Sequence, residues 1–172
     1  SQADEAIEAA IRLVDELHQE FPESDRFKFD LAETLSAITS FRPSDLQRLM
    51  RSRQLCRELV EAHPQTPEYR SLYAATLARI AGIQVSQGKS DLAASTLQEV
   101  LTQYQQLTDQ FPDVLMYLFA LVRTQQQLSH IYTKDKRPDL AKKSLDDAIK
   151  RLEALPIRKN GRKPVNVILN RM

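Results

Sequence analysis

A chain of 172 residues is long enough for one domain that buries about 70% of the surface its unfolded form exposes. Its charged share of 27% and hydrophobic share of 42% are ordinary for a soluble globular protein, and a net charge of +1 points to neither nucleic acid nor membrane. Three glycines without sustained alternation argue against a β fold, the lone Cys56 excludes an internal disulfide, and no segment has the roughly 20 apolar residues of a membrane span.

The first half of the chain predicts three helices, because apolar residues recur there at helical spacing. We expect the first helix over residues 1–20, where acids are enriched near the start. The second follows a corner at Phe21-Pro22 and reaches Arg42-Pro43. Ser44-Asp45 suits the cap of the third.

The second half predicts four more helices. Thr66-Pro67-Glu68 is the clearest start signal, since it combines a cap, a proline in the first turn and an acid. That helix should end at Gln87-Gly88, because glycine favours the backbone conformation that stops a helix. Ser90-Asp91 caps the next one. The sixth is expected over residues 112–132, and the seventh follows a turn at residues 135–138.

One short pattern occurs three times. Each copy has a ring before a proline, an aromatic residue five positions after the proline and a large apolar residue four positions further on. The prolines are Pro22, Pro64 and Pro112, which are 42 and 48 residues apart (64−22 and 112−64). Self-similarity at this period is typical of a solenoid array of repeats.

Each copy of the pattern predicts a corner between two helices, because proline suits the first turn of a helix but not its interior. We expect the ring before the proline to close the preceding helix. Phe27, Tyr69 and Tyr117 should occupy equivalent, largely buried positions. The sequence therefore predicts an all-α fold, a right-handed α-solenoid of antiparallel helix pairs with about seven helices over residues 1–155.

Residues 156–172 depart from the array, since the next corner aromatic would fall at Gly161. This tail has five basic residues and no acid. It also has four aliphatic residues that are too apolar to remain comfortably in water: Val165, Val167, Ile168 and Leu169. We expect them to fold back onto the last helices, with the basic residues facing solvent.

The later helix of each pair has a small–large–small rhythm that lets two helices pack closely. The positions are Ala10, Val14 and Leu17; Ser52, Cys56 and Leu59; Ala93, Leu97 and Val100; and Ala141, Leu145 and Ala148. Gly88 stands where a tight turn between paired helices is needed. With these features, residues 1–155 resemble tetratricopeptide repeats.

The segment HPQTPEYRSLYAATLARIAG also resembles the long-period repeats of large bacterial signalling proteins, including kinase-linked arrays in planctomycetes. The helices are longer than those of the short form, whose period is roughly 34 residues. Tyr132 matches a tyrosine of the family pattern, whereas the corresponding positions of the other two copies hold Gln84 and Arg42.

The resemblance implies a concave groove lined by the earlier helix of each pair. Its positions, carried over from the family, are Glu33, Ser36, Ser40, Ala75, Ala78, Gly82, Val85, Arg123, Gln126, His130 and Thr133. Four of these positions, on the second of the three helices, are small and apolar: Ala75, Ala78, Gly82 and Val85. Their small size either leaves room for a partner's side chain or lets neighbouring helices touch. Chaperone-tail-binding members clamp a terminal carboxylate with asparagines and lysines, whereas the asparagines here are all in the tail (Asn160, Asn166, Asn170), so that activity is disfavoured.

The sequence has no catalytic pattern. His18, His63 and His130 lie on three separate helical regions, and His63 takes the place of the other corner rings. There is no phosphate loop, zinc spacing or nucleophile motif. Adjacent acids such as Asp146-Asp147 do not face each other on a helix. We therefore expect no enzyme activity, no cofactor and no metal site.

These observations favour a non-catalytic interaction module that binds a peptide or protein segment in the groove, as part of a larger signalling or scaffolding protein. The alternative is nucleic-acid binding through the tail and the arginines of one helix, Arg48, Arg51, Arg53 and Arg57. A solvated helix face explains the same arginines. Nucleic acid ranks second because the total charge is near neutral and no aromatic residues lie among the arginines.

The first residues, Ser1-Gln2, include no methionine, which suggests an excised fragment or a processed product. A signal peptide or anchor could have been removed, so localisation is not readable from the sequence, with the cytoplasm slightly favoured. The oligomeric state is equally open.

Overall fold

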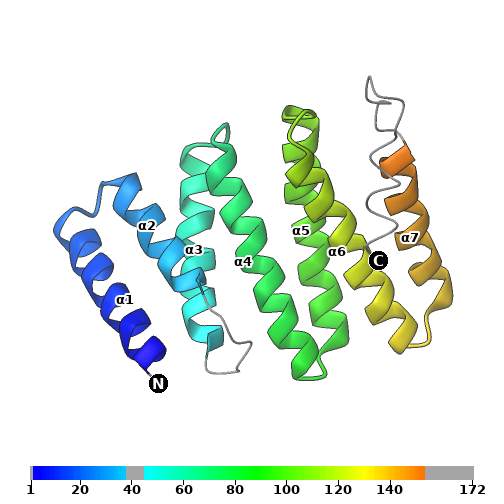
Figure 1. Cartoon of the computed structure of the whole chain (residues 1–172), viewed down its shortest axis with the longest axis horizontal. Helices are drawn as coiled ribbons and strands as arrows, with labels where there is room; N and C mark the ends of the chain where they lie inside the picture. The colour runs from blue at the N-terminus through cyan, green and yellow to red at the C-terminus, as the bar shows by residue number, and fades with distance from the viewer. Residues whose placement is uncertain (1, 38–44, 154–172) are drawn as a thin grey trace.

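The computed structural model describes residues 2–37 and 45–153, and the regular secondary structure within these ranges is helical (Figure 1). The helices are α1 (Gln2–Glu20), α2 (Asp25–Ser36), α3 (Leu46–Ala62), α4 (Pro67–Ser86), α5 (Ser90–Gln110), α6 (Leu115–Lys134) and α7 (Pro138–Glu153). The prediction of an all-α fold is confirmed for this part of the chain.

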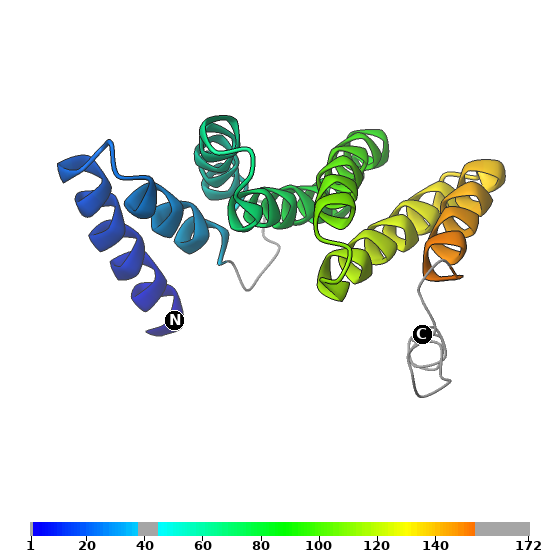
Figure 2. The ribbon, with the colours of Figure 1, turned by 90° about the horizontal axis from the view of Figure 1, so that it is seen from above.

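The helices stand side by side in chain order, each antiparallel to its neighbours, from α1 at one end of the row to α7 at the other (Figure 1). Each helix packs against the next one in the chain, and α2 also contacts α4. Seen from above, α3 and α5 lie on one side of the row, while α2, α4 and α6 lie on the other (Figure 2). The fold is an all-α solenoid, and we call this second side the α2–α4–α6 face.

The three predicted corners have the same backbone hydrogen bonds. The N–H of each ring residue donates to the carbonyl four residues earlier: Phe21 to Leu17 (3.0 Å), His63 to Leu59 (2.9 Å) and Phe111 to Leu107 (2.8 Å). A second bond closes the turn three residues later: Ser24 to Phe21 (3.0 Å), Thr66 to His63 (3.1 Å) and Val114 to Phe111 (3.1 Å). Each ring residue therefore closes the preceding helix, as predicted.

The prolines themselves lie in these turns and not in the first turn of a helix, which corrects the prediction. Helices α2, α4 and α6 each begin three residues beyond the proline, at Asp25, Pro67 and Leu115. The reason is that proline also suits the second position of a four-residue turn, where its fixed φ is already correct.

Each corner ring contacts the aromatic residue that follows its proline. The ring centroids are 5.6 Å apart for Phe21 and Phe27, 5.9 Å for His63 and Tyr69, and 6.3 Å for Phe111 and Tyr117. The three later aromatics are thus equivalent, as predicted. Each is half-buried, so burial is less complete than the sequence suggested.

One hydrophobic core runs through the array, from Leu31 on α2 to Ala141 on α7. The small–large–small positions of the inner helices are its centre: Ser52, Cys56 and Leu59 on α3 are all fully buried. The outermost helices differ, because only one neighbour covers each of them. Leu145 on α7 is 42% exposed, and Ala10 on α1 is also exposed.

Helix α4 begins and ends where the sequence predicts, whereas α2 ends earlier than predicted. Helix α4 begins at Pro67 and ends before Gly88, whose φ of 73° is the left-handed conformation that glycine adopts freely. Helix α2 ends at Ser36, several residues before the predicted Arg42-Pro43. Branched and hydroxyl-bearing residues follow at positions 38–40, and these are weak helix formers. The predicted tail contacts lie outside the described residues.

Candidate functional site

A hollow of about 390 Å³ opens between α4 and α6, and Leu97 of α5 forms part of its wall. Its lining is Ala78, Ala81, Gly82 and Val85 from α4, Leu97 from α5, and Arg123, Gln126, Gln127, His130 and Ile131 from α6. The side chains from α4 and α5 are small or aliphatic, whereas most of those from α6 are polar. Such a site suits an aliphatic side chain that is flanked by polar groups.

Small residues on α4 make room for this hollow. Ala78, Gly82 and Val85 follow one another at helical spacing, so they form one stripe, and each is half-buried. Leu77 and Ala81 beside them are at most 1% exposed and hold the helix in the core. The stripe therefore borders the hollow while the rest of α4 is packed between its neighbours.

Six of the predicted groove residues line the hollow together: Ala78, Gly82, Val85, Arg123, Gln126 and His130. Ala75 is half-buried on α4 and does not line it, and Glu33 and Thr133 are exposed elsewhere. Ser40 lies outside the described residues. The structure thus brings six of the predicted residues together between α4 and α6, and their role in binding stays a prediction.

Ser36 is fully buried, which corrects its assignment to an open groove. Its hydroxyl oxygen accepts hydrogen bonds from Thr76 (3.1 Å) and Arg79 (2.8 Å). Thr76 lies 3.3 Å from the Ser52 hydroxyl, which donates to the Ala32 carbonyl (2.7 Å). These groups form a buried polar network that joins the C-terminal end of α2 to α3 and α4.

Arg79 and Tyr104 belong to the same region and were not predicted. Arg79 on α4 is half-buried, and Tyr104 on α5 is 6% exposed. Burial lowers the pKa of Arg79 and raises the pKa of Tyr104, while Arg123 and Arg79 both oppose the rise at the tyrosine. The sequence showed an arginine between Ala78 and Gly82 but not its neighbours.

Three of the four arginines on α3 pair with carboxylates of other helices. Arg48 contacts Glu8, Arg51 donates two hydrogen bonds to Asp15, one of them 2.9 Å long, and Arg53 lies 3.4 Å from Glu99. Arg57 instead donates to Gln54 on the same helix. Most of the positive charge of α3 is thus matched by acids on other helices.

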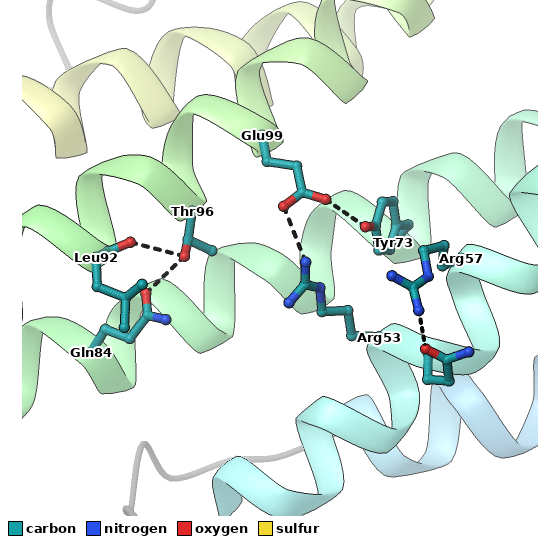
Figure 3. Close-up of polar contacts among 8 residues, drawn as sticks. Arg53, Arg57, Tyr73, Gln84, Leu92, Thr96 and Glu99 are labelled. Atoms are coloured by element: carbon teal, nitrogen blue, oxygen red, sulfur yellow. Dashed lines mark hydrogen bonds and ion pairs between the residues drawn. The ribbon is translucent and has the colours of Figure 1, made fainter.

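A second hollow of about 400 Å³ lies between α3 and α5. Met50 and Leu92 at its edge are 46% and 52% exposed. Glu99 accepts hydrogen bonds from Tyr73 (2.5 Å) and Arg53 there, and Thr96 donates to Gln84 (2.9 Å), as Figure 3 shows. Three charged residues line this hollow: Arg53 and Glu99 are paired with each other, and Lys89 is exposed.

No helix within residues 2–37 and 45–153 is long and apolar enough to cross a membrane. In the same ranges, no group of three or more His, Cys, Asp or Glu side chains could hold a metal ion. Burial raises the pKa of the Cys56 thiol to about 11, so this thiol stays protonated and unreactive at neutral pH.

No known protein family and no curated protein matches this sequence. Among solved structures, the crystal structure of MamA is similar. The two sequences are 14% identical, the match covers 88% of this chain and 92% of that one, and the TM-score is 0.36.

Proposed function

We propose that this chain is a protein-interaction module that binds a peptide or protein segment on the α2–α4–α6 face, with the hollow between α4 and α6 as its centre. We also propose that it serves a larger signalling or scaffolding protein and belongs to the long-period tetratricopeptide repeats that its sequence resembles. The module acts by holding a partner and catalyses no reaction.

The observation that supports this proposal is the composition of the hollow. Ala78, Gly82 and Val85 offer an apolar surface, and Arg123 and His130 stand beside it, both exposed. An extended segment could place an aliphatic side chain against the first group and polar atoms against the second. The two groups come from different repeats, so a bound segment would bridge them.

The proposal can be tested without knowing the partner. Short random peptides displayed on phage are selected on the immobilised full chain. Selected peptides should lose binding to Ala78→Leu, whose larger side chain fills the hollow, and to the double variant Arg123→Glu/Gln126→Ala. They should keep binding to Ser95→Leu, which places the same side chain in the hollow between α3 and α5. Far-UV circular dichroism verifies that each variant is folded.

Two results would contradict this function. One is a selection that yields no peptide bound specifically by the folded chain. The other is a set of peptides that bind the Ala78→Leu variant and the parent equally well.

Nucleic-acid binding through α3 and the tail stays the alternative. It predicts oligonucleotide binding that weakens steeply with salt and weakens further in Arg57→Glu. Arg57 is the informative position, because its contact with Gln54 involves no other helix. The carboxylate partners of Arg48, Arg51 and Arg53 make this alternative the weaker one.

A further inference from the structure

The third repeat has a glutamine where the other two have a core leucine. The thirteenth residue after the corner proline is Leu35 in the first copy, Leu77 in the second and Gln125 in the third (35−22, 77−64 and 125−112). All three side chains are buried, with 2%, 0% and 4% of their surface exposed. The residue before each of them is a threonine, so the register of the three copies agrees. A polar side chain therefore replaces an apolar one at a core position of α6.

The amide oxygen of Gln125 is buried and has no hydrogen-bond partner among the described residues. A buried acceptor without a donor is unfavourable, whereas a leucine at the same place carries no such penalty. Stability alone therefore favours the leucine of the first two copies and does not account for the glutamine of the third.

Gln125 borders a hollow of about 420 Å³ that α5, α6 and α7 line together. Gln98, Thr102 and Gln105 border it from α5 and Arg151 borders it from α7. The three residues of α5 are four and three positions apart, so they form one stripe along the helix. This hollow shares no lining residue with the hollow between α4 and α6, so it is a separate site.

Gln105 supplies a second amide oxygen of the same kind. Its amide nitrogen donates to the Asp109 carboxylate (2.6 Å), and because a carboxylate only accepts, this bond fixes which end of the amide is the oxygen. That oxygen is buried and has no partner among the described residues. The last torsion of a glutamine turns easily, so the oxygens of Gln105 and Gln125 can both face a group that enters the hollow. What they lack is an N–H donor.

We propose that this hollow binds the backbone of an extended peptide segment, whose N–H groups donate to the oxygens of Gln105 and Gln125 and whose carbonyl accepts from Arg151. A side-chain amide has a donor group and an acceptor, as a peptide unit has, so the two match. The stripe from Gln98 to Gln105 spans about 10 Å of α5, the length of about three extended residues, so a repeating backbone can follow it. This second site goes beyond the proposed function and reads main chain instead of side chains.

The test compares the parent with Gln125→Leu, which restores the residue of the other two repeats. Random peptides displayed on phage are selected on the full chain and then depleted on the folded variant. The remaining peptides should bind the parent at least about tenfold more tightly than Gln125→Leu and Gln105→Met, by fluorescence anisotropy. Gln110→Leu, changed at an exposed position outside the hollow, should bind them as the parent does. If Gln125→Leu fails to fold, the depletion uses Gln105→Met.

Esters show whether the backbone is recognised. Each peptide linkage of a selected peptide is replaced in turn by an ester, which removes one N–H and leaves every side chain in place. Replacement at one or two linkages should weaken binding about tenfold. Equal affinity of all the esters would overturn the inference, because the peptide would then be held by its side chains.

Thermal unfolding checks the reason given for the glutamine. Gln125→Leu should melt about 2–4 °C above the parent, since it removes an unpaired buried acceptor and restores the leucine of the other copies. A variant that melts below the parent would show that Gln125 has a structural partner, and this would count against a site built to receive an N–H.

The two proposed sites can fail separately. Peptides that depend on Gln125 should still bind Ala78→Leu, which changes only the hollow between α4 and α6. If depletion on Gln125→Leu leaves no peptide, the amide site is wrong and the function proposed for the other hollow is untouched. If the remaining peptides also lose binding to Ala78→Leu, they do not occupy a separate site and this inference is wrong.

Discussion

Lys136 occupies the same position in its turn as Gly88 does one repeat earlier. The two are 48 residues apart (136−88), the spacing of Pro64 and Pro112, and both have positive φ, 57° and 73°. The turns also share a bond that spans five residues, from the N–H of Lys89 to Gln84 (2.9 Å) and from that of Arg137 to Tyr132 (2.8 Å). A side chain with a Cβ is disfavoured in this conformation, so Lys136 holds it against its own preference.

Lys136→Gly should therefore stabilise the protein by about 1 kcal/mol, since glycine adopts positive φ without a steric penalty. Gly88→Ala should destabilise it by about the same amount. An added Cβ at Gly88 would meet no atom within 4 Å, so this loss would be conformational and not a clash. Urea unfolding measures both free energies. A Lys136→Gly variant less stable than the parent would contradict the equivalence of the two turns.

The corner rings allow a second prediction, because they are buried to different degrees. Phe111 packs against the main core, whereas Phe21 is 47% exposed. Phe111→Ala should reduce the free energy of unfolding by about 2–3 kcal/mol and Phe21→Ala by about 1 kcal/mol. Thermal or urea unfolding of the two variants checks the order. Equal losses would mean that the rings act through the backbone turn and not through packing.

The contact between Arg51 and Asp15 joins α3 to α1 and should be measurable. Their side chains are 45% and 23% exposed, so a double-mutant cycle with Arg51→Met and Asp15→Asn should give a coupling of about 0.5–1 kcal/mol at neutral pH. The hydrogen bond from Arg51 holds the pKa of Asp15 below its ordinary value of 3.8. A carboxylate with a lowered pKa stabilises the fold above the ordinary value and loses this effect as the pH falls. The coupling should therefore shrink below pH 3.8 and in high salt, and a coupling insensitive to both would refute an ionic contact.

The features that could be predicted from the sequence depend on local chemistry. Proline, glycine and ring residues determine where α4 begins, where it ends and how the corners close, so their pattern located the helices. The stripe of Ala78, Gly82 and Val85 was found for the same reason, since helical spacing alone places these residues on one face.

The features that could not be predicted depend on which helices meet. Ser36 looked like a surface residue because nothing in its own segment shows that Thr76 and Arg79 approach it from α4. The arginines of α3 looked uncompensated because their acids lie on α1 and α5, up to 46 residues away. Lys136 gave no sign of positive φ, since lysine has no preference for that conformation.

The last prediction concerns the single thiol. Cys56 is fully buried, and its pKa rises from 9.0 to about 11 because burial disfavours the thiolate. Below pH 9 the thiol is protonated in both the folded and unfolded chain, so it has no effect on the pH dependence of stability. Between pH 9 and about 11 the unfolded chain loses the proton and the folded chain retains it, so the free energy of unfolding should fall by about 1.4 kcal/mol per pH unit from this group.

The matched control is Cys56→Ala, which has no thiol. Tyr73 and Tyr104, whose pKa values burial also raises, titrate alike in both proteins, so the difference between the two curves isolates the cysteine. Urea unfolding from pH 7 to pH 11 should show the parent losing stability faster than Cys56→Ala above pH 9. Parallel curves would show that the thiol ionises as easily in the folded state as in the unfolded chain, and hence that the interface between α3 and its neighbours opens to water around it.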